Sequence, residues 1–201
     1  MRPLDVGHGH VPGAAFEAQY QASLDPWDFA SSPYEQRRYD LTVAMLPPRR
    51  YRRGFEPGCS IGELTVRLAA RCDSVVAMDC SPTAVSRARA RCRGLDHVTV
   101  SVGELPHAWP SGTFDLVVLS EIGYYFPHGP LASLIARSAA GLEAGGALLA
   151  VHWRGHSSDH VLHGDEVHEL ARVEAAARRL HLAGSYLEDE FRADVWTKEA
   201  S

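Results

Sequence analysis

The sequence predicts an α/β fold, with a mostly parallel sheet and helices on both of its faces. From about residue 50, short apolar runs alternate with stretches of helical periodicity. Such alternation is typical of right-handed βαβ units. A glycine-containing stretch, residues 55–63, lies between the first apolar run and the first helical stretch. Sheets of this class bind ligands beyond the carboxyl ends of their strands, so this stretch is the first candidate site.

The N-terminal part of the chain is predicted to be helical. Residues 14–24 suit a short helix, and an aromatic loop around Trp27 follows it. Ser32 and Pro33 are a favourable N-cap and first position for a second helix, which Pro47 and Pro48 stop. We therefore expect residues 1–48 to form a helical cap or lid segment before the main fold.

The core is expected over residues 50–197, within a single domain of residues 1–201. Residues 75–78 form an unbroken apolar run, as a parallel strand buried on both faces should. The tail alternates in two short runs, which predicts two paired strands. Strands are expected at 52–56, 75–79, 97–102, 114–119, 147–153, 183–188 and 191–197, and helices at 62–71, 82–93, 131–142 and 165–180.

Composition limits the class of protein and of partner. A length of 201 residues suits one domain with a proper core. The formal charge of −5 argues against a nucleic-acid-binding surface. No apolar run reaches the roughly 20 residues that span a membrane, and the four cysteines form no C-x-x-C pair. A cytoplasmic protein with a small-molecule partner is expected, while the oligomeric state stays open.

Acidic residues stand at the ends of successive predicted strands. Glu56 ends the first, Asp79 the second, Glu104 the third, and Ser120-Glu121 the fourth. An acid at the end of the second strand can accept hydrogen bonds from both hydroxyls of a ribose.

The glycines of residues 55–63 argue against a dinucleotide site. Gly58 and Gly62 permit positive φ and close approach of a ligand. A dinucleotide fingerprint needs glycine at the third and sixth positions from Gly58, where this chain has Ser60 and Glu63. An acidic side chain there would repel a pyrophosphate. A ligand without phosphates, carrying adenosine and a cationic amino-acid end, suits this acidic set better.

The same residues resemble a known family. Glu56-Pro57-Gly58 with Gly62, then Asp79, Gly103-Glu104-Leu105 and the apolar run 114–118 are similar to class I S-adenosylmethionine-dependent methyltransferases. The resemblance implies a Rossmann-like fold, a seven-stranded sheet with an antiparallel last strand, and S-adenosylmethionine as cofactor.

The resemblance also implies roles for individual residues. Glu56, Gly58, Ser60 and Gly62 would cradle the methionine part of the cofactor, and Asp79 would hold its ribose. The remaining expected cofactor-binding residues are Cys80 beside Asp79, Glu104 and Leu105 at the adenine, Ser120 near the methionine ammonium, and Trp27, Tyr34 and Arg38 in the lid.

A narrower resemblance is to the nodulation protein S branch. It rests on Asp25-Pro26-Trp27, residues 34–39, residues 56–62, residues 124–126 and residues 152–154. It implies N-methylation of an amino sugar, such as a deacetylated chitooligosaccharide, or of a related amine. Two alternatives stay open: O-methylation of a natural-product hydroxyl, and a non-catalytic module that binds S-adenosylmethionine.

Methyl transfer from a sulfonium needs an aligned nucleophile and a group that takes its proton. His152 at the end of the fifth strand is the first candidate base, and Glu121 is the second. Tyr124 and Tyr125 could hydrogen-bond the acceptor. No metal is expected, although His152, His156, His160, His163 and His168 suggest zinc, because glycines interrupt any single helix and no cysteine joins them.

Overall fold

The computed structural model describes residues 11–200. Their contacts divide the chain into two compact units. We call residues 12–111 the N-terminal unit, and residues 112–200 together with Val11 the C-terminal unit. Each unit is described by itself. The prediction of a single domain over residues 1–201 stays a prediction, and the first ten residues of the expected cap lie outside the described part.

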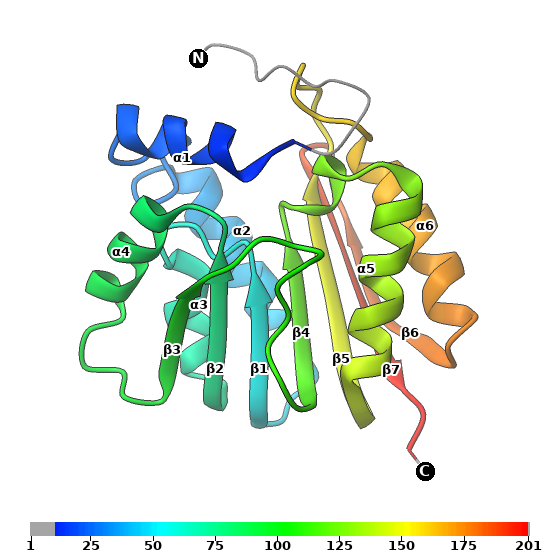
Figure 1. Cartoon of the computed structure of the whole chain (residues 1–201). Helices are drawn as coiled ribbons and strands as arrows, with labels where there is room; N and C mark the ends of the chain where they lie inside the picture. Colours follow the sequence, from blue (N-terminus) through cyan, green and yellow to red (C-terminus); the bar gives the residue numbers. More distant parts are fainter. Residues whose placement is uncertain (1–10, 201) are drawn as a thin grey trace. The chain divides into compact units, whose positions relative to one another are not determined.

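The N-terminal unit holds three parallel strands in the order β3-β2-β1 (Figure 1). Their bounds agree with the predicted ones to within a few residues. The helix α4 packs against β2 and β3, and α3 packs against β2. In chain order the elements are α1 (Gly13–Ala22), α2 (Pro33–Ala44), β1 (Tyr51–Pro57), α3 (Glu63–Ala69), β2 (Cys72–Asp79), α4 (Pro82–Arg91) and β3 (Val98–Val102).

Serine caps begin two of these helices. Ser32 Oγ accepts a hydrogen bond from Glu35 N, and Ser81 Oγ accepts one from Ala84 N. A proline follows each serine at the start of the helix, where its missing N–H costs nothing. The predicted N-cap of α2 at Ser32 is confirmed.

The core of the N-terminal unit joins its sheet to α4. Ala77 on β2 and Val100 on β3 pack with Val85 and Ala88 of α4. A Cβ at Gly62 would lie 3.1 Å from the Cα of Ala88. Glycine at position 62 therefore lets α4 come close to the loop that leaves β1, which fixes that loop from behind.

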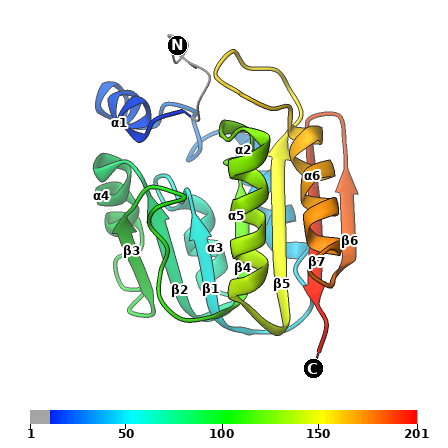
Figure 2. The same cartoon turned by 45° about the vertical axis from the view of Figure 1, so that its right-hand side comes forward.

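The C-terminal unit holds four strands in the order β4-β5-β7-β6. β4 and β5 are parallel, whereas β7 is antiparallel to both β5 and β6. Helices α5 and α6 lie together over this sheet (Figure 2). The elements are β4 (Phe114–Ser120), the 3₁₀ turn η1 (Gly123–Tyr125), α5 (His128–Gly141), β5 (Leu142–Trp153), α6 (Gly164–Ala176), β6 (Leu180–Leu187) and β7 (Phe191–Lys198).

The largest differences from the predicted bounds in the C-terminal unit are at the start of β5 and the end of α6. β5 begins five residues early, at Leu142, and carries Gly145 at φ 71° inside the strand. The register of β4 and β5 shifts between Phe114 and Leu116, so Gly145 belongs to an irregularity inside the strand. α6 ends at Ala176, before the predicted residue 180. The turn η1 was not predicted, because three residues carry no periodicity.

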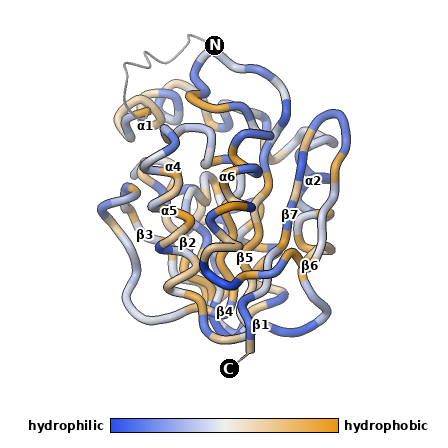
Figure 3. Tube along the Cα trace, turned by 90° about the vertical axis from the view of Figure 1, so that its right-hand side faces the viewer, coloured by the Kyte–Doolittle hydropathy of each residue, from blue (hydrophilic) through white to orange (hydrophobic). Residues whose placement is uncertain are grey.

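α6 is amphipathic, and Figure 3 shows both hydrophobic and hydrophilic stretches along it. Val167, His168, Ala171 and Ala175 are buried on its inner side. Between residues 11 and 200, no helix combines the length and the apolar run that crossing a membrane requires.

Candidate functional site

The loop between β1 and α3 has an unusual backbone. Gly58, Ser60 and Gly62 all have positive φ, at 74°, 51° and 85°. Positive φ at a residue with a side chain is uncommon, so Ser60 is held there by its surroundings. The amides of Gly58 and Cys59 both donate to the carbonyl of Met78, at 2.7 and 3.0 Å. The loop is thereby tied to the end of β2.

Glu56 is a buried carboxyl group at the end of β1. Its side chain is 2% exposed, and Oε2 accepts a hydrogen bond of 2.6 Å from the hydroxyl of Thr65. Burial is the main cause that raises the pKa of Glu56 to about 8. The hydrogen bond from Thr65 opposes the rise, and the negative charge of Asp79 adds to it. A cation placed beside Glu56 would favour the ionised form, so this site is suited to an ammonium group.

Asp79 ends β2 and braces the same loop. Its Oδ2 accepts from the amide of Ser60 at 2.8 Å, and its Oδ1 accepts from the amide of Ser81 at 2.9 Å. Burial raises the pKa of Asp79, while these backbone hydrogen bonds oppose the rise. Each carboxylate oxygen keeps further acceptor capacity. Asp79 can therefore hold the loop and still receive two hydroxyl groups.

Glu104, at the end of β3, contacts the first helix. Its Oε1 accepts a hydrogen bond of 2.8 Å from the amide of Gly13. A Cβ at Gly13 would lie 3.0 Å from this oxygen and 3.1 Å from the Cβ of Cys80. Glycine at position 13 therefore lets the start of α1 reach two of the predicted cofactor-binding residues. Leu105, the other residue expected at the adenine, is 8% exposed.

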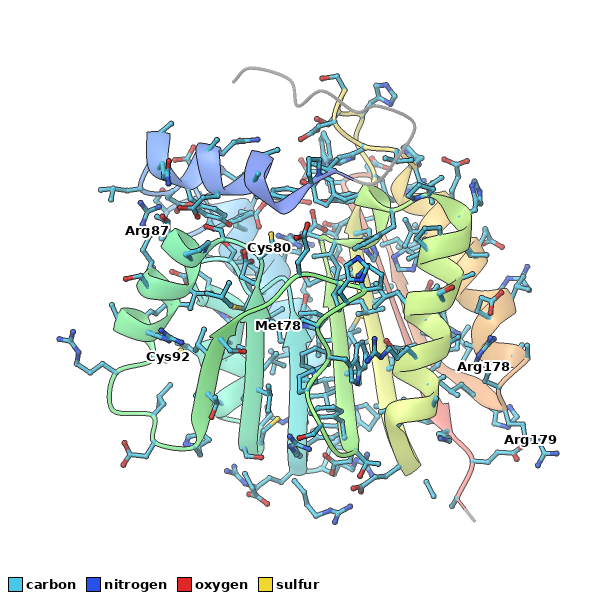
Figure 4. All side chains as sticks on the ribbon, viewed as in Figure 1. Met78, Cys80, Arg87, Cys92, Arg178 and Arg179 are labelled. Carbon is cyan, nitrogen blue, oxygen red and sulfur yellow. The ribbon has the colours of Figure 1, made fainter. Side chains whose placement is uncertain are left out.

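α1 is fastened to the beginning and the side of α4. Glu17 accepts hydrogen bonds from the hydroxyls of Ser81 and Thr83 and from the amide of Thr83. These bonds lower the pKa of Glu17 to about 2. Arg87 donates to the carbonyl of Tyr20 at 2.8 Å, and it lies beside α1 in Figure 4, where Cys80 is labelled near the end of β2. These contacts hold α1 over the loop.

Aromatic residues link α1 to the glycine loop. The hydroxyl of Tyr20 donates to Ser60 Oγ, and its ring makes an edge contact with Trp27 at 5.3 Å. Trp27 also packs on a buried cluster that includes Ile61. The predicted lid residue Trp27 is thus in contact with the loop that Asp79 braces.

The other two predicted lid residues belong to α2. Arg38 is 1% exposed, pairs with Glu35, and lies over the ring of Tyr39 at 5.1 Å. Tyr34 is half-buried in the first turn of α2. All the predicted cofactor-binding residues except Ser120 belong to the N-terminal unit.

The C-terminal unit holds Ser120 and the four predicted catalytic residues. Ser120 ends β4 and is 8% exposed. Glu121 follows it with φ 58°. Glu121 Oε1 accepts from the amide of Trp153 at 2.7 Å, and Oε2 accepts from the hydroxyl of Tyr124 at 2.7 Å. Both carboxylate oxygens are therefore fixed in direction.

Tyr124, which donates to this carboxylate, belongs to a group of aromatic rings. Tyr124 stacks on His160 with ring centroids 3.7 Å apart, and Tyr125 meets Tyr124 edge-on at 4.8 Å. Burial raises the pKa of Tyr125, and burial lowers the pKa of His160. A fixed carboxylate beside tyrosine rings can bind an ammonium group through charge and cation–π attraction. His160 was missed as a site residue, although its four-residue spacing from His156 stood out in the sequence.

His152 is fully buried, and both its ring nitrogens are engaged. Nε2 accepts from the amide of Gly123 at 3.0 Å, and Nδ1 lies 3.2 Å from Nε2 of His168. In this arrangement His152 offers no lone pair to a substrate. The structure thus places His152 beside Glu121 and Tyr124 in the same unit, but not as an exposed base. His168 and Asp194 were missed because they lie on other elements.

Among residues 11–200, no group of three or more histidine, cysteine, aspartate or glutamate side chains is arranged to hold a metal ion. His152 and His168 meet through a hydrogen bond, and His160 stacks on a tyrosine.

Comparison with known proteins identifies the family. The family model for nodulation protein S (NodS) matches residues 16–134, which include the glycine loop, Asp79, Glu104 and Glu121. The chain belongs to the nodulation protein S family. Nodulation protein S of Rhizobium tropici is 30% identical over 105 residues, or 52% of this chain and 44% of that protein. The chain spans about half the length of the curated nodulation protein S relatives that it matches.

Solved structures show the fold. N-methyltransferase NodS from Bradyrhizobium japonicum WM9, in complex with S-adenosyl-L-homocysteine, matches with a TM-score of 0.79 at 21% identity over 92% of this chain and 97% of that one. A Pseudomonas syringae protein provisionally assigned as a methyltransferase is 41% identical, with a TM-score of 0.73, and covers 82% of this chain and 99% of that one. The predicted class I methyltransferase fold is confirmed.

Proposed function

We propose that this protein is an S-adenosylmethionine-dependent methyltransferase that N-methylates a small polar amine. One observation carries the proposal: the loop with positive φ at Gly58, Ser60 and Gly62 lies between two buried carboxyl groups, Glu56 and Asp79. The family model and the methyltransferase fold support it.

The N-terminal unit would bind the cofactor. Asp79 would accept hydrogen bonds from the ribose hydroxyls, and Glu56 would meet the methionine ammonium. Glu104 would accept from the adenine amino group, in place of or beside the amide of Gly13. The cofactor supplies an activated methyl group. The protein residues would hold it in one conformation for an in-line displacement.

The C-terminal unit would hold the acceptor. Glu121 would bind the ammonium form of an amine, and Tyr124 and Tyr125 would surround it. Methyl transfer requires the neutral amine, so a proton must leave before attack. Glu121 is better placed than His152 to receive it, because His152 is buried with both nitrogens engaged.

An amino sugar is our first choice of acceptor. One relative supports an N-acceptor: a solved member of the family is named as an N-methyltransferase. A carboxylate with neighbouring tyrosine hydroxyls suits a substrate that carries both an amine and hydroxyl groups.

The cofactor assignment can be tested by thermal unfolding. A ligand that binds the native state raises Tm by mass action. We expect S-adenosylhomocysteine to raise Tm of the wild type, and Asp79→Ala to abolish the rise. Asp73→Ala is the matched control, because Asp73 lies on the same strand but is exposed and paired with Arg50. An equal rise in Asp79→Ala would refute the ribose assignment.

The acceptor class can be tested by a methyl-transfer screen. Deacetylated chitooligosaccharides, simple amines and phenols would be offered with labelled S-adenosylmethionine. Transfer to the amino sugars supports the proposal. Transfer to phenols alone would overturn the N-acceptor and point to O-methylation, and cofactor binding with no transfer to any acceptor would favour a non-catalytic binding module.

A further inference from the structure

A buried chain of hydrogen bonds runs through four elements of the C-terminal unit. The amide of Gly123 donates to His152 Nε2 at 3.0 Å, and His152 Nδ1 lies 3.2 Å from His168 Nε2. His168 Nδ1 lies 2.6 Å from Asp194 Oδ2. The three side chains are 0%, 0% and 1% exposed. We call these four residues, from η1, β5, α6 and β7, the histidine relay.

The two ends of the relay fix the direction of every hydrogen bond in it. A backbone amide can only donate, so His152 Nε2 must be the unprotonated nitrogen and Nδ1 must carry the proton. His152 Nδ1 then donates to His168 Nε2, which leaves the proton of His168 on Nδ1. That proton is donated to the carboxylate of Asp194. A single arrangement, with both imidazoles neutral, satisfies all the groups, and burial makes any other arrangement costly.

The carboxylate end of the relay is held ionised. Asp194 Oδ2 also accepts from Arg192 Nε at 2.8 Å, and Arg192 pairs with Glu169 at 3.1 Å. Burial alone would raise the pKa of Asp194, but the hydrogen bond from His168 and the charge of Arg192 bring it below its ordinary value. The relay therefore ends in an anion that keeps accepting.

The amide end of the relay admits no side chain. A Cβ on Gly123 would lie 2.7 Å from His152 Nε2 and 2.5 Å from Cγ1 of Val167 on α6. The turn η1 is thus pressed directly onto the relay. Glu121 and Tyr124, which hydrogen-bond to each other, stand on either side of this glycine in the chain.

We propose that His152, His168 and Asp194 are positioning residues, which hold the amide of Gly123 and thereby set the geometry of Glu121 and Tyr124. The inference rests on the proposed function in taking these two residues as the acceptor-binding groups. It assigns His152 the role of a hydrogen-bond acceptor for the backbone and no role in removing a proton from the substrate.

Two substitutions of His152 separate positioning from proton removal. In His152→Gln the side-chain oxygen can reach the place of Nε2 and accept from Gly123, but it cannot act as a base. His152→Leu removes the acceptor. We expect His152→Gln to keep kcat within about tenfold of the wild type, and His152→Leu to raise the acceptor KM, lower kcat, or both, by about a hundredfold, as misplacement of a substrate-binding group can. A loss of kcat in His152→Gln as large as in His152→Leu would overturn the proposal.

Hydrogen exchange of the Gly123 amide tests the histidine relay independently of enzyme activity. We expect the Gly123 amide to be protected in the wild type and in His152→Gln, and to exchange at least about tenfold faster in His152→Leu, the loss that about 1.4 kcal/mol of local opening produces. An unchanged Gly123 amide in a folded His152→Leu would refute the positioning role. If wild-type protein methylates no acceptor, the proposed function fails while this measurement still decides the relay.

Imidazole nitrogen NMR on the wild type keeps the inference testable if His152→Leu does not fold. Both His152 and His168 should show a protonated Nδ1 and an unprotonated Nε2. Observation of a protonated Nε2 on His152 would exclude the hydrogen bond from Gly123 and with it the relay. Binding of S-adenosylhomocysteine should be equal in His152→Gln and wild type, since every predicted cofactor-binding residue except Ser120 lies in the N-terminal unit.

Discussion

Two buried carboxyl groups, one in each unit, differ in what surrounds them. Glu56 in the N-terminal unit accepts from the neutral hydroxyl of Thr65, and its pKa is raised to about 8. Asp194 in the C-terminal unit accepts from His168 and Arg192, and its pKa is lowered. Burial acts in the same direction on both groups. The carboxylate of Asp194 is therefore already matched by positive or protonated partners inside the protein. The carboxyl group of Glu56 is unmatched and would gain most from a cationic ligand.

Removal of the matched carboxyl should have the largest effect. Asp194→Ala leaves the buried Nδ1 proton of His168 without its acceptor and removes one of the two carboxylates that pair with Arg192. We expect a loss of about 3–5 kcal/mol in the free energy of unfolding, measured by urea denaturation. Asp194→Asn is the matched control, because its carbonyl oxygen can still accept from both donors and should lose much less. Equal losses in the two variants would show that charge matters more than the acceptor.

Neutralising the unmatched carboxyl should stabilise the ligand-free protein. The folded pKa of Glu56 lies above its ordinary value of 4.5, so the native state binds more protons than the unfolded state. Stability therefore falls as pH rises from about 4.5 to about 8. Glu56→Gln should remove this fall, a gain on the order of 3 kcal/mol at pH 7. Urea unfolding of both proteins at pH 5 and pH 8 measures it.

Ligand binding provides a second test of the unmatched carboxyl group of Glu56. If Glu56 meets the methionine ammonium, Glu56→Gln should weaken binding of S-adenosylhomocysteine while it raises Tm of the free protein. A variant that gains no stability between pH 5 and pH 8 relative to wild type would contradict the raised pKa of Glu56. If Glu56→Gln bound S-adenosylhomocysteine with unchanged affinity, Glu56 would not be a contact of the methionine ammonium.

A partly exposed carboxylate, that of Glu17, should show the smallest effect. Glu17 is held by the hydroxyls of Ser81 and Thr83, and its pKa is lowered to about 2. The contribution of Glu17 to the free energy of unfolding is therefore complete above pH 4.5 and is lost as pH falls towards 2. Glu17→Gln should lower Tm slightly at pH 7 and make no difference near pH 2. A larger loss than that of Asp194→Ala would mean that α1 supports the unit far more than its contacts indicate.

The positions of most residues in the predicted cofactor site followed from the sequence, because they depend on short local patterns. Gly58 and Gly62 have positive φ, which glycine permits, and the acids lie at strand ends: Glu56 on β1, Asp79 on β2 and Glu104 just after β3. The carboxyl ends of parallel strands meet at one edge, so three strand assignments were enough to gather these acids. The contact between Glu104 and the amide of Gly13 could not be predicted, because it joins residues 91 positions apart with no pattern between them.

The arrangement of the predicted acceptor-binding residues followed from the sequence only in part. Glu121, Tyr124 and Tyr125 lie close together in sequence, and a single turn brings them together. His152 was predicted as a base at the end of the fifth strand, and the structure shows it buried and engaged on both nitrogens. The stacking of His160 on Tyr124 also escaped the sequence, because the loop that carries it has no regular period.

The sequence by itself determined the α/β class, the order of strands and helices, the glycine loop and the row of acids at the strand ends. These follow from residue types and spacing over a few positions, which is the range in which backbone preference and hydrophobic period act. Only the tertiary structure decided what each charged or titratable group pairs with. Hydrogen bonds need atoms within about 3 Å, and packing of β5, α6 and β7 alone brings His152, His168 and Asp194 to that distance.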